Sequence, residues 1–262
     1  MKNVVISGST RGIGLAMAKR FLMSGCKVTI SGRSPVISDF TKAELVGYEE
    51  KYTYIACNVS IVSDVESLWK QSLVKWGIID IWINNAGRNS PYQYIYEVET
   101  SYVDALIDTN IKGLIYGSQV ASRMMLLQGE GQIWNMEGLG SNNMIQLKTV
   151  LYGMTKHALT YFTKGLAKEL KGTPVRAGRL SPGMMLTDFI TKTPDGEISP
   201  VLKEKSFISI FNILADKPEK VATFFIPKIL ENRKNNAHLV WLTNRKVMWR
   251  FMVSLFVKRK LL

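Results

Sequence analysis

Short apolar runs alternate with amphipathic, helix-length segments over most of this chain, and this alternation limits the folds open to it. In the first helix-length segment, Ile13, Met17 and Phe21 share one face by their i, i+4 spacing. Strands that alternate with helices predict a parallel sheet with right-handed crossovers and helices on both faces. The six runs expected to form strands are residues 3–8, 27–33, 52–59, 79–87, 131–136 and 175–183.

The expected fold class is therefore α/β, a Rossmann-type doubly wound parallel sheet that forms one domain over residues 1–262. Residues 187–216 break the alternation, with Pro and Gly at first and apolar residues later. A surface excursion explains the first half of this segment, whereas a mobile lid over a ligand explains the whole of it. We expect a substrate lid.

The composition is that of an ordinary globular protein, with 46% hydrophobic and 21% charged residues. Cys26 and Cys57 sit in or beside apolar stretches, which indicates core thiols in a reduced compartment. The N-terminus lacks a signal-peptide core, and no apolar run reaches the roughly 18 residues that cross a bilayer, so we expect a cytoplasmic protein. The two His and two Cys have no ligand spacing, and no metal site is expected.

The net charge of +13 is concentrated near the C-terminus. Residues 217–262 carry eleven Lys and Arg against two Glu, a net charge of +9, which leaves +4 for residues 1–216. Such asymmetry indicates an anionic partner for the tail. Nucleic acid is disfavoured as that partner, because no zinc-finger, RNP-type or basic-zipper pattern organises an interface.

Residues 245–262 are expected to form a basic amphipathic helix whose apolar stretch is flanked by Lys and Arg. The eleven residues between the flanking lysines cover about 16 Å as a helix, too little to span a membrane. Packing on the active site, packing on a partner subunit and contact with an anionic membrane interface all stay open. The apolar positions recur at helical spacing: Met248, Phe251, Met252, Leu255 and Phe256.

A glycine-rich turn, SGSTRGIG at residues 7–14, follows the first expected strand and opens the first helix. Gly8, Gly12 and Gly14 let the backbone turn tightly and let its N–H groups approach a pyrophosphate, while the helix N-terminus favours negative charge. In this strand–turn–helix context, the turn predicts a dinucleotide phosphate site.

The end of the second expected strand indicates which dinucleotide binds. An Asp or Glu there would accept the ribose hydroxyls of NAD and repel a 2′-phosphate, but the sequence has Arg33 and Ser34. Arg33 offers a cationic fork for a phosphate, and Arg11 in the glycine turn supplies a second cation. NADP (NADPH) is therefore the expected cofactor.

Tyr152 and Lys156 lie four residues apart and would share one face of a helix. A free tyrosine has a pKa of about 10, too high for a base at neutral pH, and a nearby ammonium is expected to lower it. Tyr152 could then give a proton to a carbonyl oxygen or take one from an alcohol, while a cofactor carries the hydride.

A hydroxyl donor normally precedes such a pair at the end of the preceding strand, and here it is missing. That place holds Glu137, Gly138 and Leu139, and the nearest hydroxyl is Ser141. Because the flanking glycines let the loop curl, we expect Ser141 to donate to the substrate oxygen, with Asn142 or a backbone N–H as alternatives. Glu137 has two equal interpretations, binding a polar substrate group or capping a backbone turn.

The motifs together resemble those of the short-chain dehydrogenase/reductase family, in the family's order. NMEGLGS at 135–141 and VWLTNRKVMWRF at 240–251 further resemble the chlorophyll b reductase branch, where the serine also lies in a Gly-rich loop shortly before the tyrosine. The matching motifs are SGSTRGIG at 7–14, NNAG at 84–87, Asn110 in DTNIKG, YGMTK at 152–156 and SPGMMLT at 181–187.

The resemblance implies that Asn110, Tyr152 and Lys156 form the catalytic group, that Lys156 bonds the nicotinamide ribose and that Asn110 holds a proton-relaying water. It also implies a homo-oligomer. Asn58 stands where an Asp usually contacts adenine and can still accept a hydrogen bond. The expected cofactor-binding residues are Gly8, Ser9, Thr10, Arg11, Gly12, Ile13, Gly14, Arg33, Ser34, Asn58, Val59, Asn84, Ala86, Gly87, Tyr152, Lys156, Pro182, Gly183 and Thr187.

The expected function is NADP(H)-dependent hydride transfer between the cofactor and the carbonyl or alcohol group of an apolar small molecule, with Tyr152 as the acid/base. The alternative is a catalytically silent NADP-binding protein that senses redox state or scaffolds partners. The missing serine favours this alternative, whereas the intact Tyr152, Lys156 and Asn110 oppose it.

Overall fold

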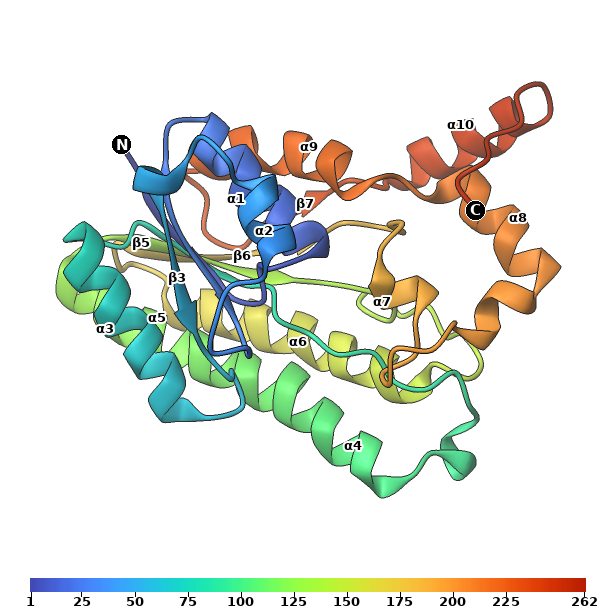
Figure 1. The fold of residues 1–262 in the computed structure, drawn as a ribbon, viewed down its shortest axis with the longest axis horizontal. Helices are drawn as coiled ribbons and strands as arrows, with labels where there is room; N and C mark the ends of the chain where they lie inside the picture. The colour runs from blue at the N-terminus through green and yellow to red at the C-terminus, as the bar shows by residue number, and fades with distance from the viewer.

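Seven parallel strands form the central sheet of the computed structural model, which describes residues 1–262 (Figure 1). Their order is β3-β2-β1-β4-β5-β6-β7, so the direction of winding reverses between β1 and β4. The α/β fold class expected from the sequence is confirmed. The strands are β1 (Asn3–Ile6), β2 (Lys27–Gly32), β3 (Tyr52–Ala56), β4 (Ile81–Asn84), β5 (Gly131–Met136), β6 (Val175–Ser181) and β7 (Ala237–Val240).

Helices cover both faces of the sheet, as the alternation of apolar runs predicts (Figure 1). A separate cluster of buried apolar side chains fills each of the two interfaces between helices and sheet. One face carries α1 (Gly12–Met23), α2 (Asp39–Glu44) and α9 (Pro218–Leu230), and the other carries α3 (Val62–Trp76), α4 (Thr100–Ile107), α5 (Gly113–Gln128) and α6 (Val150–Glu169).

The strand β7 was not expected from the sequence. It has only four residues, lies at the edge of the sheet and is incompletely buried. An edge strand needs no continuous apolar run, and the sequence AHLV has none because His238 interrupts it. Its register places His238 beside Arg179 of β6. The sheet therefore extends one strand beyond the six that the sequence indicates.

The segment 187–216 contains α7 (Asp188–Thr191), a 3-10 turn (Pro200–Lys203) and α8 (Lys205–Leu214). Hydrogen bonds from the side chains of Asn89, Tyr92 and Tyr102 fasten its first part to residues 89–102. Asn89 donates to the Phe189 carbonyl at 2.9 Å, Tyr102 donates to Asp195 at 2.6 Å, and Tyr92 donates to Glu204 at 3.1 Å. The lid role of this segment stays a prediction.

The C-terminal helix α10 (Asn244–Ser254) ends earlier than the expected range 245–262. After it the chain turns back, because the Arg259 guanidinium donates to the carbonyls of Ile213 at 2.6 Å and Ala215 at 2.7 Å. A helix continued to residue 262 would carry Arg259 away from these acceptors. No helix of this structure combines the length and the apolar content needed to cross a bilayer.

Asp216 is the centre of the contacts that hold this C-terminal part. Its carboxylate accepts hydrogen bonds from Arg250, from Trp241 Nε1 at 2.8 Å and from Arg259 at 3.2 Å, although the residue is only 2% exposed. Burial alone raises the pKa of Asp216, but the hydrogen bonds from Arg250 and Trp241 outweigh it and hold that pKa below its ordinary value.

Asp216→Asn should lower the free energy of unfolding by about 3–5 kcal/mol, because it leaves the buried Arg250 guanidinium without its counter-ion. Denaturant unfolding at neutral pH measures the loss. Because the folded-state pKa of Asp216 is lowered, its contribution exists above the unfolded pKa of about 3.9 and disappears as the pH falls through the folded value.

The difference between Asp216→Asn and wild type should therefore shrink in acid. Asp39→Asn is the matched control, since the Asp39 carboxylate is fully exposed and its loss should change stability by less than about 0.5 kcal/mol. Equal stability of Asp216→Asn and Asp39→Asn at neutral pH would contradict this account of the C-terminal contacts.

Candidate active site

The carboxyl ends of the strands open into one long cleft with a volume of about 2020 Å³. This is where an open α/β sheet offers a binding site, next to the reversal of winding between β1 and β4. The glycine turn after β1 forms one end of the cleft, and α7, α8 and the loop after β5 form the other.

Glycines in the turn allow an unusually close backbone contact. Gly8 has a φ of +61°, and a Cβ added to it would lie 2.7 Å from the Ala86 Cα. A Cβ on Gly14 would lie 2.5 Å from the Gly8 carbonyl oxygen. No other residue fits either position without moving the backbone, so the turn keeps the compact shape expected of a phosphate cradle.

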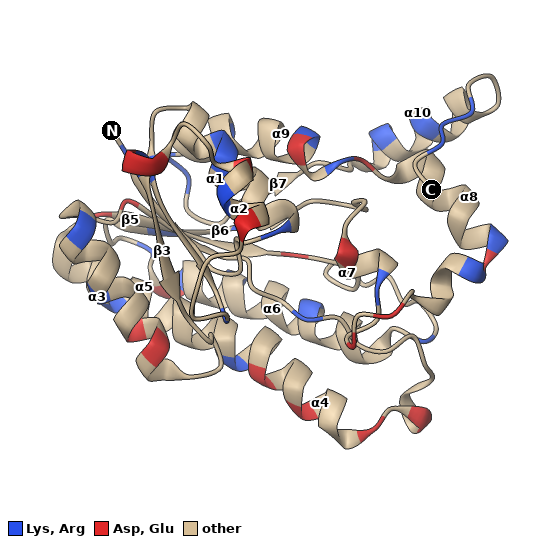
Figure 2. Cartoon of the chain, viewed as in Figure 1, with Lys and Arg blue, Asp and Glu red and all other residues tan.

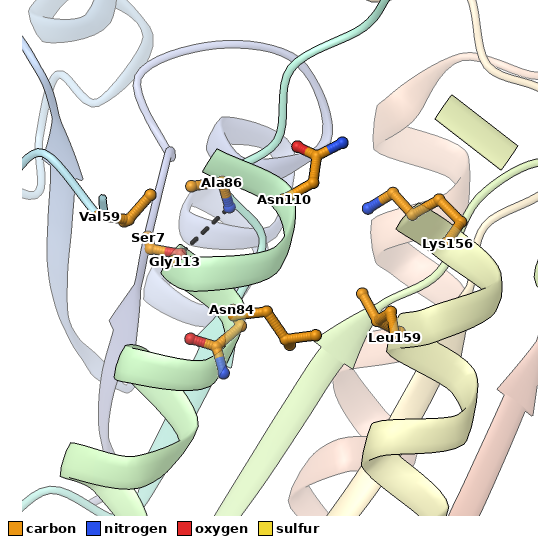
Figure 3. Close-up of a pocket in the computed structure, with 9 residues that line it drawn as sticks. Ser7, Val59, Asn84, Ala86, Asn110, Gly113, Lys156 and Leu159 are labelled. Carbon is orange, nitrogen blue, oxygen red and sulfur yellow. Dashed lines mark hydrogen bonds between the residues drawn. The ribbon is translucent and has the colours of Figure 1, made fainter. Parts of the chain in front are cut away.

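Asn85 holds this turn in place, and sequence reasoning missed it. Its side-chain amide donates to the carbonyls of Ser7 at 3.0 Å and Gly8 at 2.8 Å. The Ser7 hydroxyl in turn accepts from the backbone N–H groups of Asn85 and Ala86, the latter drawn in Figure 3. The signal was the second Asn of NNAG, at the end of a strand adjacent to the glycine turn.

Asn84, which the sequence placed beside the cofactor, lies below the cleft instead. Its side chain accepts from Trp82 Nε1 at 2.8 Å and donates to Ser118 at 3.0 Å and Asn135 at 2.8 Å. Ser9 is also fully buried, with its hydroxyl on the Ile6 carbonyl at 2.7 Å. Neither residue lines the cleft, so both support its floor.

The other expected cofactor residues do line the cleft. Arg33 is exposed at the end of β2, and Arg11 forms an ion pair with Asp188 of α7 at 3.8 Å. The Asn58 side-chain oxygen already accepts from the Ser60 hydroxyl at 2.8 Å, which leaves its amide group as a donor. The lining residues are Gly8, Thr10, Arg11, Gly12, Ile13, Gly14, Arg33, Ser34, Asn58, Val59, Ala86, Gly87, Tyr152, Lys156, Pro182, Gly183 and Thr187.

Tyr152 and Lys156 lie one turn apart on α6 and both are buried, with exposed fractions of 8% and 6%. Lys156 Nζ donates to the Met136 carbonyl at the end of β5, at 2.9 Å, and lies 5.8 Å from the centre of the Tyr152 ring. Phe189 of α7 packs edge-on against that ring, with 5.4 Å between the centroids. The phenol therefore lies between α7 and the loop after β5.

Burial governs the protonation of this pair. It raises the pKa of Tyr152, and it lowers the pKa of Lys156 to about 8, against a smaller upward effect of Glu137. The lowering of the Tyr152 pKa expected from the sequence is not found, because burial desolvates the phenol.

Asn110 is positioned by a π-helical turn (Asp108–Lys112) between α4 and α5. Its amide oxygen accepts from the Arg88 N–H at 2.8 Å, and its nitrogen donates to the Arg88 carbonyl at 3.0 Å and to Thr155 at 3.1 Å. A cavity of about 10 Å³ lies between Asn110 and Lys156, whose side chains point toward one another in Figure 3. This volume is about that of one water molecule.

Gly138 lies directly against the tyrosine hydroxyl. A Cβ added to Gly138 would be 2.3 Å from the Tyr152 hydroxyl oxygen, so a serine side chain at this position is incompatible with the observed phenol. Ser141 lines the cleft three residues later, but its hydroxyl accepts from the Gly138 N–H and donates to the Lys156 carbonyl, both at 3.2 Å. Its role as a substrate donor stays a prediction.

Glu137 does not cap a backbone turn, whereas its binding of a polar substrate group stays a prediction, because the residue lines the cleft. Its carboxylate is buried and accepts from Thr160 at 3.0 Å, from Arg179 at 3.3 Å and from His238 at 2.8 Å. Burial raises its pKa, but His238 and Arg179 outweigh burial and hold the pKa below its ordinary value. Glu137 thus joins β5, β6, β7 and α6 beside Tyr152 and Lys156.

Gly138→Ala should reduce turnover by roughly a hundredfold, because a new Cβ 2.3 Å from the Tyr152 hydroxyl oxygen forces the phenol to move by about an ångström. Affinity for a nicotinamide cofactor should change little, since the glycine turn is untouched. Steady-state kinetics and cofactor titration measure the two effects. Gly165→Ala on the same helix as Tyr152 is the control, because an added Cβ there meets nothing. Full activity in both variants would contradict the placement of the phenol.

Comparison with known proteins identifies the family. Residues 2–197 match the family model described as short chain dehydrogenase. The probable chlorophyll(ide) b reductase NYC1, chloroplastic, of Arabidopsis thaliana is 32% identical over 271 residues, which are 97% of this chain and 53% of that protein. The chlorophyll(ide) b reductase NOL, chloroplastic, of Oryza sativa subsp. japonica is 37% identical over 235 residues, 87% of this chain and 66% of that protein. The chain thus spans about half to two thirds of these relatives.

Two solved structures have the same architecture. ElxO with NADP bound is 26% identical and gives a TM-score of 0.79, with 94% of this chain and 99% of that chain covered. A 3-ketoacyl-(acyl-carrier-protein) reductase from Brucella melitensis, complexed with NADH, is 23% identical, gives a TM-score of 0.79 and covers 94% of this chain and 98% of its own. The second likeness bears on the fold alone. Because the family model matches residues 2–197 of its 262 residues, this chain belongs to the short-chain dehydrogenase/reductase family of oxidoreductases.

Proposed function

We propose that this protein catalyses NADP(H)-dependent reduction of the carbonyl group of an apolar small molecule, or oxidation of the corresponding alcohol. One observation carries the proposal. The buried Tyr152 and Lys156 line the same cleft as the glycine turn and the two arginines, Arg11 and Arg33. An acid/base pair and a site for a phosphorylated dinucleotide therefore share one space.

The residues fit a nicotinamide dinucleotide. Gly8 and Gly14 leave no room for a Cβ, so the turn can hold a pyrophosphate against its N–H groups and the start of α1. Arg33 and Arg11 would hold a 2′-phosphate, and Pro182, Gly183 and Thr187 would border the nicotinamide end. When bound, the nicotinamide supplies or accepts the hydride. ElxO, whose structure is named with NADP bound, supports the phosphorylated form.

Tyr152 is suited to give a proton. Its raised pKa keeps the phenol protonated at neutral pH, ready for a carbonyl oxygen that gains negative charge. Lys156, with a pKa of about 8, is mostly an ammonium at neutral pH and would stabilise the phenolate that remains. The water-sized cavity between Lys156 and Asn110 offers a place from which a proton could be returned.

The other end of the cleft indicates the substrate class. Its apolar lining beside Tyr152 favours an apolar carbonyl compound over a charged metabolite. The relatives named chlorophyll(ide) b reductase add chlorophyllide b as a specific candidate. The apolar residues of this end include Leu139, Phe189, Val201, Phe207, Ile210 and Leu214.

NADPH oxidation with a panel of aldehydes and ketones, including chlorophyllide b, tests the proposal. Tyr152→Phe should lower kcat by roughly a hundred- to ten-thousandfold, because the proton donor is lost. Ser141→Ala should also lower kcat strongly if the serine hydroxyl orients the substrate. Both variants should keep the affinity for NADPH measured by fluorescence titration, since neither residue holds a phosphate. Ser63→Ala, at an exposed position on α3 outside the cleft, serves as the control.

Each outcome separates the alternatives. NADPH binding by the wild type without turnover of any compound on the panel would favour the silent sensor or scaffold. Turnover that survives Ser141→Ala would remove the serine from the donor role and leave a backbone N–H or Asn142 in its place. Turnover that survives Tyr152→Phe would overturn the mechanism.

Arg33→Ala should raise the KM for NADPH by roughly ten- to a hundredfold, because it removes a charge-assisted hydrogen bond to the 2′-phosphate. The KM for NADH should change little, so the ratio of the two constants is the measurement. Arg233→Ala, an exposed arginine beyond α9, is the control for a simple loss of charge. An unchanged ratio in Arg33→Ala would show that Arg33 does not select NADP.

A further inference from the structure

Helix α10 presents its apolar side to solvent and its polar side to the protein. Arg250 is the one buried residue of the helix. On the opposite side Met248 is 67% exposed, Met252 is 59% exposed, and Leu255 and Phe256 at its end are 80% and 86% exposed. A helix that packs on a soluble core has the reverse arrangement. The apolar stripe predicted from the sequence is therefore real, but it is not used within the chain.

The contacts of Asp216 fix this orientation. Arg250 and Arg259 both donate to the buried Asp216 carboxylate, and Arg250 also donates to the Leu214 carbonyl at 2.5 Å. A rotation that buried the apolar side would pull Arg250 from this carboxylate and leave a buried charge unpaired, which is strongly unfavourable. The outward apolar surface is thus a stable property of the fold.

Positive charge borders this surface at both ends. Arg245 is exposed at the start of α10, and Lys258 and Lys260 are exposed just beyond its end. Residues 244–262 contain no Asp or Glu. Figure 2 shows Lys and Arg along α10 and its following loop, with no acidic residue among them.

A second copy of this chain is a poor match for such a surface. In a two-fold symmetric contact between two α10 helices, an antiparallel pair sets the basic start of one beside the basic end of the other. A parallel pair sets like ends together. Either arrangement brings cations against cations without a counter-charge, which costs free energy as the apolar residues are buried.

We propose that α10 docks this protein on an anionic lipid bilayer. The helix lies in the plane of the interface, with Met248, Met252, Leu255 and Phe256 inserted among the acyl chains. Arg245, Lys258 and Lys260 contact the anionic headgroups. Amphipathic helices with a basic border bind membranes in this way, through buried apolar area together with electrostatic attraction. The helix is too short to span the bilayer, which agrees with an in-plane position.

The docking surface adjoins the mouth of the cleft. α8 packs against α10, and Phe207 and Ile210 of α8 and Val247 of α10 line the cleft that contains Tyr152. Docking therefore brings the apolar end of the cleft to the lipid surface. The proposal goes beyond the catalytic one, because vesicle binding requires neither turnover nor a bound cofactor.

Co-sedimentation of the full chain with vesicles tests it. The wild type should bind vesicles of phosphatidylcholine with phosphatidylserine and bind much less to phosphatidylcholine alone. Leu255→Ser combined with Phe256→Ser should weaken binding by roughly tenfold or more, because two large apolar side chains no longer insert. Val74→Ser combined with Leu127→Ser is the matched control, since both residues are equally exposed on α3 and α5. That control should bind as the wild type does.

Three results would overturn the proposal. The first is that the wild type sediments equally with vesicles that contain phosphatidylserine and with vesicles of phosphatidylcholine alone, or that it sediments with neither kind. The second is unchanged binding by the Leu255/Phe256 variant. The third is that the wild type self-associates in gel filtration and the Leu255/Phe256 variant does not. That result would assign the surface to contact with a second copy of the chain. Melting temperatures of both double variants confirm that the fold is kept, because all four substituted side chains are exposed.

Discussion

The close contact between the turns after β1 and β4 is the constraint on which the site depends. Gly8 touches Ala86 so closely that no side chain fits between them, and the Asn85 amide closes the contact with two hydrogen bonds. This contact occurs where the order of strands reverses, so the glycine turn and the ends of β4 and β5 meet at one edge of the sheet. The glycine turn therefore lies at the same edge of the sheet as the cleft that Tyr152 and Lys156 line.

Two buried carboxylates hold the part of the fold that lies beyond this edge. Glu137 joins β5 to β6 and β7 through Arg179 and His238, and Asp216 joins the end of α8 to α10 through Arg250. Both have lowered pKa values because their partners outweigh burial. Removing the arginine partner of either carboxylate would leave a buried charge without its counter-ion, which is strongly destabilising.

Sequence patterns predicted the sheet and most of the site, because these depend on local rules. Periodicity located six strands, and glycine spacing located the turn that holds Gly8 and Gly14. The short, half-exposed strand β7 has no such period. Asn85 and Glu137 act through contacts with residues distant in sequence, so spacing alone does not give their partners. The early end of α10 depends on the contacts of Arg259 with residues 213 and 215, which local propensity does not encode.

The water-sized cavity beside Lys156 lies apart from the apolar mouth of the cleft. It is enclosed by Ser7, Asn84, Asn110 and Lys156, on the sheet side of the lysine, whereas the apolar mouth lies toward α7 and α8. A bulky ligand that fills the mouth therefore leaves this cavity free. Under the proposed function, a large substrate in the apolar mouth and a water molecule in this cavity would therefore occupy different sides of Lys156.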